Sequence, residues 1–349
     1  MSLIVYTTEQ AEEWDSVVCS FEHYDVYFMC GYVKAFRLHG DGEPMLFYYE
    51  SHTSPLRGIN VVMKRDIADD GRFRGRLAAG YWFDFNTPYG YGGWLLEGGG
   101  DEPELFHAYE AWCREHNIVS EFVRYHPVLG NCVFSDGPYE VIPLGNTIAM
   151  DLSSPEVIWQ NLTSKNRNMI RKAIKSGIVI YNGRYPEIYQ RFREVYNSTM
   201  DKDQADSYYY FSDGFYESIL RDLPQNAQVF YAQLEGKVVA ASIILAANGR
   251  LNYHLSGSLQ EYQSLAPTNL LLFEAALWGA ANACRTFHLG GGVGSREDSL
   301  YRFKKAFYRG ASSRFCIGRK IFMEDEYRAL AEMREEPAGD SGFFPGYRA

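Results

Sequence analysis

The segment from residue 228 to residue 289 constrains the fold of this chain more than any other. Alternating or continuous apolar patterns predict four strands, at residues 228–234, 238–247, 251–256 and 285–289. Asn248-Gly249, between the second and third of them, is a strong hairpin signal. Residues 268–284 follow Pro267 and are apolar on all sides, which predicts a buried helix. The predicted order is three strands, a loop, a helix and a strand, which is an α/β arrangement with mixed sheets.

The first half of the chain repeats this order of elements. Strands are predicted at residues 44–50, 59–64 and 119–124, a loop at residues 86–93 and a helix at residues 103–116. No residue-level repeat accompanies the order, but the matching elements predict two copies of one α/β unit. We therefore expect one domain at residues 1–150, a second at residues 151–330 and a flexible tail at residues 331–349.

The composition is that of an ordinary soluble globular protein, with 46% hydrophobic and 22% charged residues. The net charge of −10 argues against nucleic-acid binding by the whole surface, although a local basic patch is compatible with it. Residues 1–20 are acidic and lack an apolar run, and no later stretch has the length of a membrane span. The six cysteines are scattered without a CxxC pair, which predicts reduced thiols. We expect a cytoplasmic protein.

A glycine-rich turn follows the last predicted strand of the second half. His288-Leu-Gly-Gly-Gly leads into an amphipathic segment in which Phe303 and Phe307 are spaced i,i+4, with Lys304 and Lys305 between them. Glycines let a backbone approach a ligand closely. Two lysines held by aromatic anchors offer positive charge for a phosphate or a developing oxyanion. The alternative is a capping turn followed by solvated lysines.

A basic segment lies between the two halves. Residues 164–177 carry five cations and no acid, namely Lys165, Arg167, Arg171, Lys172 and Lys175. Three of the five are spaced i,i+4, so a helix ending at Gly177 would place them along one face. The segment is either a site for phosphate or a nucleic-acid backbone, or a solvated helix face.

Several chemistries lack support in the sequence. The histidines are isolated, and His254 and His288 lie in predicted strands without spaced partners, so no metal site is expected. There is no G-x-S-x-G motif, no dinucleotide fingerprint and no P-loop.

The loop before the buried helix is placed to bind an anion, because the free N–H groups of a helix start point outward. In acetyltransferases of the GNAT type the corresponding loop reads Gln/Arg-x-x-Gly-x-Gly/Ala and holds the pyrophosphate of coenzyme A. Here Gln263-x-x-Ala266-x-Thr268 resembles a degraded version. Pro267 removes one N–H donor and Ala266 replaces a glycine, which weakens a coenzyme A interpretation.

The second half resembles the Fem family from about residue 228 to residue 309. The matching motifs are Tyr253-His-Leu-Ser-Gly-Ser, the helix start Ala-Pro-Thr-Asn-Leu-Leu, and the stretch from His288 to Phe307. Fem proteins are aminoacyl-tRNA-dependent peptidyltransferases that build peptidoglycan cross-bridges on two tandem GNAT-like domains. The resemblance implies that fold here.

Fainter matches recur in order before residue 228. Gly31-Tyr-Val-Lys34 is similar to the Fem Trp-x-x-Val-Lys, and residues 165–177 are similar to the Fem Ile-Arg-Lys-Ala-x-Lys-x-Gly helix. Thr199-Met-Asp-Lys202 is similar to Thr-x-x-Arg. Tyr89 replaces the arginine of Pro-Arg-Gly-Pro-Val, which puts the acceptor in doubt. Residues 178–227 leave no room for the long helical arm of some members, so the chain resembles an armless form.

The resemblance implies roles for particular residues. Lys304 would lie at the acyl-transfer centre, and Lys34 and Lys202 would hold the phosphates of a nucleotide- or lipid-linked muropeptide. The implied substrate-binding set is Lys34, Tyr89, Tyr91, Arg171, Lys202, Tyr253, His254, Ser256, Asn269, Phe303 and Lys305. Gln263, Ala266 and Thr268 would bind a cofactor only if coenzyme A, as acetyl-coenzyme A, is used; otherwise no cofactor is expected.

The predicted function is transfer of an aminoacyl group from aminoacyl-tRNA to an amine of a cell-wall precursor. One alternative is a coenzyme A-dependent N-acyltransferase of the GNAT superfamily. A second is a non-catalytic protein that binds a nucleotide sugar through Lys34 and the basic helix, and a third is nonspecific RNA binding.

Overall fold

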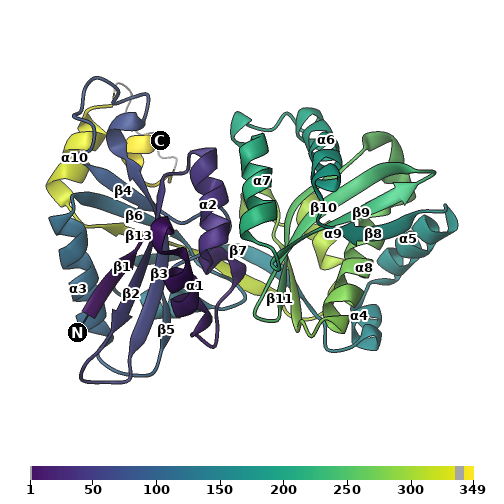
Figure 1. The fold of residues 1–349 in the computed structure, drawn as a ribbon, viewed down its shortest axis with the longest axis horizontal. Helices are drawn as coiled ribbons and strands as arrows, with labels where there is room; N and C mark the ends of the chain where they lie inside the picture. The colour runs from purple at the N-terminus through teal and green to yellow at the C-terminus, as the bar shows by residue number, and fades with distance from the viewer. Residues whose placement is uncertain (1, 335–341) are drawn as a thin grey trace. The chain divides into compact units, whose positions relative to one another are not determined.

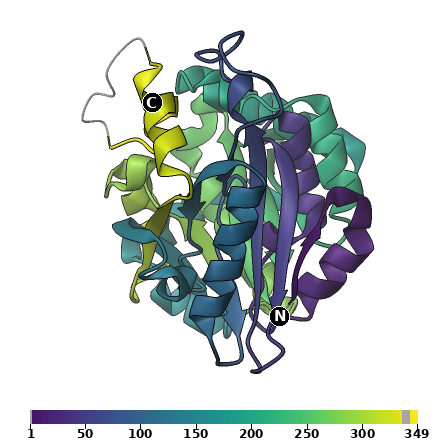
Figure 2. The ribbon, with the colours of Figure 1, turned by 90° about the vertical axis from the view of Figure 1, so that its left-hand side faces the viewer.

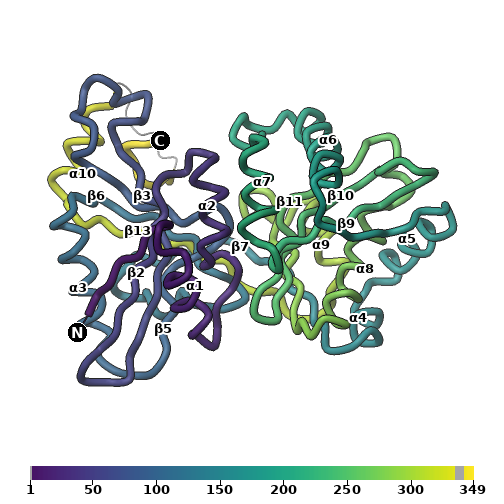
Figure 3. The backbone as a smooth tube through the Cα atoms, in the orientation of Figure 1, coloured from purple at the N-terminus to yellow at the C-terminus, as the bar shows by residue number. Residues whose placement is uncertain are grey.

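Two units make up the fold of the computed structural model, which describes residues 2–334 and 342–349 (Figure 1). The first unit comprises Met1–Leu144 and Phe315–Ala349, and the second comprises Gly145–Arg314. The division differs from the expected one, because the chain after residue 314 returns to the first unit. This return is visible as the yellow trace of β13 and α10 in Figure 3.

The second unit is built on one sheet with the strand order β7-β12-β11-β10-β9-β8. Its strands are β7 (Glu140–Asp151), β8 (Val179–Gly183), β9 (Ala227–Leu234), β10 (Lys237–Ala247), β11 (Arg250–Ser258) and β12 (Thr286–Gly290). The β11–β12 pair is parallel and its neighbours are antiparallel. The predicted hairpin is confirmed: Asn248 and Gly249 both have positive φ, as a tight two-residue turn between β10 and β11 requires.

Six helices of the second unit fall within the described residues. They are α4 (Pro155–Asn161), α5 (Ser164–Lys175), α6 (Pro186–Lys202), α7 (Asp213–Asp222), α8 (Pro267–Ala281) and α9 (Ser299–Lys305). Figure 1 shows α6 and α8 on opposite sides of the strands. The all-round apolar surface predicted for α8 is buried, because it packs in the core against β9 and β10 while α5 covers its outer side.

The first unit has a sheet with the order β1-β2-β3-β4-β6-β13, and β5 pairs with β3. Its strands are β1 (Ser2–Tyr6), β2 (Glu43–Glu50), β3 (Arg57–Asp66), β4 (Phe83–Asn86), β5 (Leu95–Glu97), β6 (Ile118–Arg124) and β13 (Ser313–Ile321). Its helices are α1 (Ala11–Cys19), α2 (Cys30–His39), α3 (Glu102–Glu115) and α10 (Glu324–Glu332). Figure 2 shows α3 on one side of these strands and α1 and α2 on the other.

The predicted repeat is confirmed by the strand pairing. The elements β2, β3, β4, α3 and β6 correspond in order to β9, β10, β11, α8 and β12. In each unit the two strands that flank this helix in the sequence are parallel, β4 with β6 and β11 with β12. In each unit an antiparallel strand then closes the far side, β13 next to β6 and β7 next to β12.

The expectation of a flexible tail needs correction for the residues that the structure describes after position 341. Tyr347 is fully buried, and its hydroxyl bonds to Asp84 Oδ2 at 3.0 Å and to Ser120 Oγ at 2.8 Å. The Arg348 Nε atom lies 2.5 Å from Asp84 Oδ2. A buried ring and a buried ion pair hold this segment to the first unit. A prediction from local composition cannot detect these contacts, because their partners lie far away in the sequence. Residues 335–341 of the expected tail lie outside the described residues.

Within the described part of the chain, no helix combines the length and the apolar character that crossing a bilayer requires.

Candidate active site in the second unit

A cavity of about 540 Å³ lies where four elements of the second unit meet. Strand β11 contributes Tyr253, His254, Ser256, Gly257 and Ser258, and the C-terminal half of α6 contributes Thr199 and Met200, with Asp203 just after it. The turn before α8 and the first turn of α8 contribute Gln263, Ala266, Pro267, Thr268 and Asn269. Helix α9 contributes Leu300, Phe303 and Lys304.

The cavity forms because strand β11 loses one neighbour. Strands β11 and β12 pair only over residues 250–252 and 286–288, and β11 then continues beside β10 alone. The β10–β11 register also shifts, since Ile243 pairs with Leu255 whereas Ile244 pairs with Tyr253. His254 is therefore the extra residue of a β-bulge. In a regular strand Tyr253 and His254 would face opposite sides, and the bulge lets both line the cavity.

A close approach of α6 to β11 supplies the opposite wall. A β-carbon at Gly257 would lie 2.6 Å from the Val195 carbonyl oxygen, so only glycine fits between strand and helix. The Thr199 hydroxyl accepts the Ser258 N–H at 2.9 Å and donates to the Val195 carbonyl at 3.0 Å. These contacts fix the end of α6, and with it Met200 and Asp203, against the end of β11.

Lys304 is held in place by the turn that the sequence singled out. Asp298 caps α9 by accepting the Tyr301 N–H at 2.9 Å, and it also accepts the Val293 N–H at 3.1 Å. The Lys304 ammonium donates to the Gly291 carbonyl at 2.7 Å and lies 5.9 Å from the centre of the Tyr253 ring. A β-carbon at Gly290 would lie 3.2 Å from Lys304 Nζ. The absence of a side chain at this position therefore leaves space for the ammonium.

Burial sets the charge state of the cavity. Lys304 is only 9% exposed, and loss of hydration lowers its pKa to about 8, against a weaker opposing effect of Asp298. Burial lowers the pKa of His254 to about 3, so its imidazole is neutral at physiological pH. Lys304 is therefore the cation among the lining residues, and it titrates close to physiological pH. Asp203 is the carboxylate among them, and it pairs with Lys202 at 3.1 Å.

The turn before α8 uses part of its backbone donors within the chain. Gln260–Leu265 is a 3₁₀ helix, and its end uses backbone donors internally: the Tyr262 N–H bonds to Leu259 at 3.1 Å and the Ala266 N–H to Gln263 at 3.0 Å. Ala266 adopts a left-handed conformation with φ 60°, which is unusual for a residue other than glycine. Pro267 has no N–H. Positions 262, 266 and 267 therefore offer no free N–H group to a ligand.

The structure places the predicted site residues in three groups. Lining the cavity are Lys304, Tyr253, His254, Ser256, Asn269 and Phe303, together with Gln263, Ala266 and Thr268. Elsewhere in the second unit are Lys305, Arg171 and Lys202. Lys305 donates to the Gly310 carbonyl at 2.6 Å, Arg171 is exposed on α5 at 5.3 Å from the Trp159 ring, and Lys202 pairs with Asp203.

The remaining three predicted residues belong to the first unit. Lys34 is half-buried on α2. The Tyr89 ring stacks on Phe36 with centroids 5.4 Å apart, and the Tyr91 ring meets Tyr27 edge-on at 5.4 Å. These residues cluster around α2 and the loop after β4.

Seven lining residues lie outside the predicted site set, namely Thr199, Met200, Asp203, Gly257, Ser258, Pro267 and Leu300. The motif Thr199-Met-Asp-Lys202 marks this segment, but the resemblance implies a role for its lysine and not for its threonine. Without a predicted α6, nothing in the sequence indicated that the threonine faces the strand. Ser258 ends the motif that begins at Tyr253, and the sequence carries no signal that this serine faces a cavity.

A buried asparagine connects the basic helix to the cavity. Asn166 of α5 is 1% exposed, its Nδ2 donates to the Ala306 carbonyl at 3.3 Å, and its Oδ1 accepts from Asn269 Nδ2 at 2.8 Å. Asn269 is a lining residue at the start of α8, and Ala306 follows Lys304 by two positions. The Thr163 N–H also donates to Ala306, at 2.9 Å. The start of α5 therefore ties together the two helix ends that carry the cavity.

The basic face of α5 is only partly committed to internal contacts. Arg167 donates to the carbonyls of Trp159 and Leu162, and Lys172 donates to the Ser264 carbonyl at 2.7 Å. Lys165, Arg171 and Lys175 are exposed.

Comparisons with known proteins agree with this architecture. Residues 164–305 match the family model described as an acetyltransferase (GNAT) domain. No curated protein matches the chain. Among solved structures, the crystal structure of FemX is similar over 94% of this chain and 99% of its own, with a TM-score of 0.66 and 11% identity.

Two further solved structures share the fold. The C-terminal domain (DUF2156) of a putative lysylphosphatidylglycerol synthetase from Agrobacterium fabrum matches over 93% of this chain and 94% of its own, with a TM-score of 0.57 and 14% identity. L-PGS from Bacillus licheniformis matches over 82% and 86%, with a TM-score of 0.52 and 13% identity. At these identities the likeness concerns the fold.

Proposed function

Because residues 164–305 form a GNAT-type acyltransferase domain within a Fem-like tandem fold, we propose that the protein transfers an aminoacyl group from aminoacyl-tRNA to an amine. The observation that carries this proposal is the buried ammonium of Lys304, the cation of a cavity that opens where β11 parts from β12. The resemblance to the Fem family suggests an amine of a cell-wall precursor as the acceptor.

In this reaction the protein mainly positions the two substrates and stabilises the charge that develops. The ester of an aminoacyl-tRNA is already activated. The acceptor nitrogen attacks the carbonyl carbon, a C–N bond forms, and the ester C–O bond to the ribose breaks. The Lys304 ammonium, itself nearly removed from water, stabilises the negative charge that develops on the carbonyl oxygen and so lowers the barrier. The proton lost by the amine goes to the leaving ribose oxygen or to water.

The donor is inferred from the walls of the cavity and from α5. In the turn before α8 the N–H groups of Tyr262 and Ala266 are used internally and Pro267 has none, which disfavours a coenzyme A donor. The exposed cations Lys165, Arg171 and Lys175 lie on a helix whose buried Asn166 contacts a lining residue, Asn269. Exposed cations of this kind support contact with the phosphates of a polynucleotide in a chain that is otherwise acidic.

A donor-exchange assay tests the proposal. Purified protein is mixed with a nucleotide-linked muropeptide and either a pool of radiolabelled aminoacyl-tRNAs or a panel of acyl-coenzyme A thioesters. We expect label to reach the muropeptide from at least one aminoacyl-tRNA and from none of the thioesters. Transfer from a thioester alone would refute the donor assignment, and transfer from neither donor would refute the acceptor assignment or the activity.

A coenzyme A-dependent N-acyltransferase is the second candidate. The family model that matches residues 164–305 is described as an acetyltransferase domain, and the N-terminal turn of α8 borders the cavity. Isothermal titration calorimetry with coenzyme A and acetyl-coenzyme A separates the two candidates. We expect no heat of binding up to about millimolar ligand, and a dissociation constant on the order of micromolar would favour this second candidate.

A further inference from the structure

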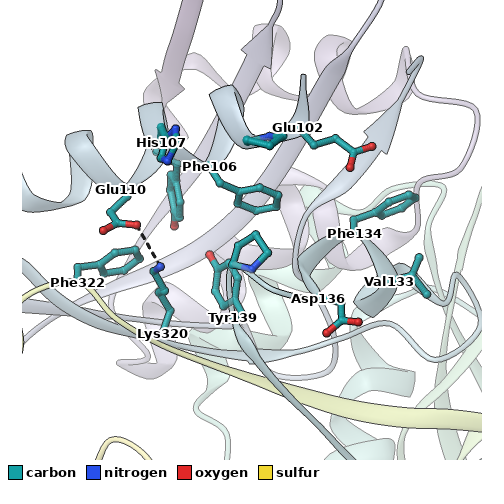
Figure 4. A pocket seen from close by; sticks show the side chains of 13 residues that line it. Glu102, Phe106, His107, Glu110, Val133, Phe134, Asp136, Tyr139, Lys320 and Phe322 are labelled. Carbon is teal, nitrogen blue, oxygen red and sulfur yellow. Dashed lines mark ion pairs between the residues drawn. The ribbon is translucent and has the colours of Figure 1, made fainter. Parts of the chain in front are cut away.

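A second cavity lies in the first unit, formed by α3, the loop of residues 131–139 and β13 (Figure 4). Its volume of about 330 Å³ falls in the range of sites for small molecules. None of its lining residues belongs to the cavity around Lys304.

Aromatic side chains form part of its walls. Phe106 comes from α3, Phe134 and Tyr139 from the loop after β6, and Phe322 from the end of β13. Phe106 and Tyr139 are packed edge to face, with ring centroids 6.2 Å apart. Phe134 is partly exposed and Val133 is 69% exposed, so apolar surface continues to the rim. Such walls fit an apolar group about the size of a ring.

The charges of this cavity are unbalanced. Its lining includes three carboxylates, Glu102, Glu110 and Asp136, and one lysine, Lys320. Lys320 pairs with Glu110 at 3.1 Å. Throughout the described residues, no ion pair joins Glu102 or Asp136 to a cation. Figure 4 shows the Glu110–Lys320 pair on one side and these two carboxylates on the other, with Phe106 and Tyr139 between them.

A buried carboxyl group lies beneath the floor, and burial raises its pKa. Glu121 is 1% exposed and accepts from Tyr139 at 2.6 Å, from Tyr109 at 3.0 Å and from Asn60 at 3.0 Å. Tyr139 and Tyr109 both line the cavity. Both hydroxyls donate to Glu121, so the rings, rather than the hydroxyls, are available to a ligand at the floor. The negative face of an aromatic ring attracts a cation.

The start of α3 disfavours an anion, which is the kind of ligand that a helix N-terminus usually binds. Asp101 caps α3 through the Glu104 N–H, and Glu102 and Glu104 occupy the first turn. These carboxylates satisfy the positive end of the helix from within the chain. A phosphate or carboxylate ligand would meet like charge here.

We propose that this cavity binds a small organic cation, an ammonium group carried on an aromatic or branched apolar body. The apolar body lies between the rings of Phe106 and Phe134, and the ammonium lies toward Glu102 and Asp136. The site is independent of the acyl-transfer function and lies on a different unit from Lys304.

Three probes of one shape and different charge test the proposal by isothermal titration calorimetry: 2-phenylethylamine, 2-phenylethanol and phenylacetate. We expect the amine to bind with a dissociation constant on the order of 1 mM or tighter, the alcohol more weakly, and the acid not at all. Equal affinity for the amine and the acid, or no binding of the amine, would overturn the proposal.

Variants then locate the binding. The double variant Glu102→Gln/Asp136→Asn should weaken binding of the amine by about fivefold or more and leave the alcohol unchanged. Both side chains are exposed, so folding should tolerate the change, and circular dichroism checks this. Glu115→Gln is the matched control, because Glu115 ends the same helix outside the cavity. An amine affinity that is the same in the double variant and in this control would place the binding elsewhere and overturn the assignment.

Discussion

At the scale of single residues, Lys304 occupies a position that costs folding free energy. Its ammonium is nearly removed from water and compensated by one backbone carbonyl, that of Gly291, and by the more distant Asp298. Lys305, next to it, donates to the Gly310 carbonyl and does not line the cavity. The spacing with Phe303 and Phe307 singles out both lysines, and it was the resemblance to the Fem family that assigned the acyl-transfer centre to Lys304. The spacing alone cannot choose between the two, because the choice depends on the helical phase of a seven-residue helix.

The lowered pKa of Lys304 predicts how a neutral variant changes stability with pH. The folded-state pKa of about 8 lies below the unfolded value of 10.5, so the folded state binds the proton more weakly. The cost of burial is complete below about pH 8 and disappears as the pH rises toward 10.5. We expect Lys304→Met to raise the free energy of unfolding by about 3 kcal/mol near neutral pH, and by much less near pH 10.

Urea denaturation of both proteins at the two pH values measures this difference. Titrations that the two proteins share cancel in the comparison. A gain that does not shrink with rising pH would show that Lys304 is not held as a buried cation.

At the scale of elements, three helix ends and one strand bulge make the candidate site. The strand pattern and the hairpin turn were predictable, because apolar runs and Asn-Gly carry local signals. The bulge at His254 was not, since it depends on the register with β10. Helix α6 was missed as well, so Thr199 and Asp203 could not be assigned to the cavity.

The connection through Asn166 gives a prediction for α5. Replacing Asn166 by Ala removes two buried hydrogen bonds, to Ala306 and to Asn269, and we expect a loss of about 1–3 kcal/mol in the free energy of unfolding. We also expect kcat to fall more than KM rises, because the ends of α8 and α9 lose their alignment. Asn168→Ala is the control: Asn168 is exposed on the same helix, where it accepts a bond from Arg171. Equal effects of the two substitutions would show that the connection has no role in positioning the site.

At the scale of the whole molecule, the repeat of two α/β units follows from the sequence, whereas the course of the chain between them does not. The order of strands and helices is a local pattern repeated twice. The return of residues 315–349 to the first unit depends on contacts across more than two hundred positions, such as that of Tyr347 with Ser120. Local patterns carry no information about such contacts.

The C-terminal contact is itself testable. We expect Tyr347→Ala to lower the free energy of unfolding by about 3–5 kcal/mol, because a fully buried ring is lost. Tyr347→Phe keeps the ring and removes the bonds to Asp84 and Ser120, and it should cost about 1–3 kcal/mol. Thermal denaturation followed by circular dichroism compares them. Wild-type stability of Tyr347→Ala would restore the expectation of a loosely held tail.

The most direct test of the central claim is a single-turnover measurement of aminoacyl transfer by Lys304→Met and Lys305→Met beside the wild-type protein. The two substitutions remove the same charge from adjacent positions, of which one faces the cavity. We predict that Lys304→Met slows the transfer step about 10²-fold or more and that Lys305→Met changes it less than about threefold. Transfer by Lys304→Met at the wild-type rate would contradict the role assigned to this ammonium.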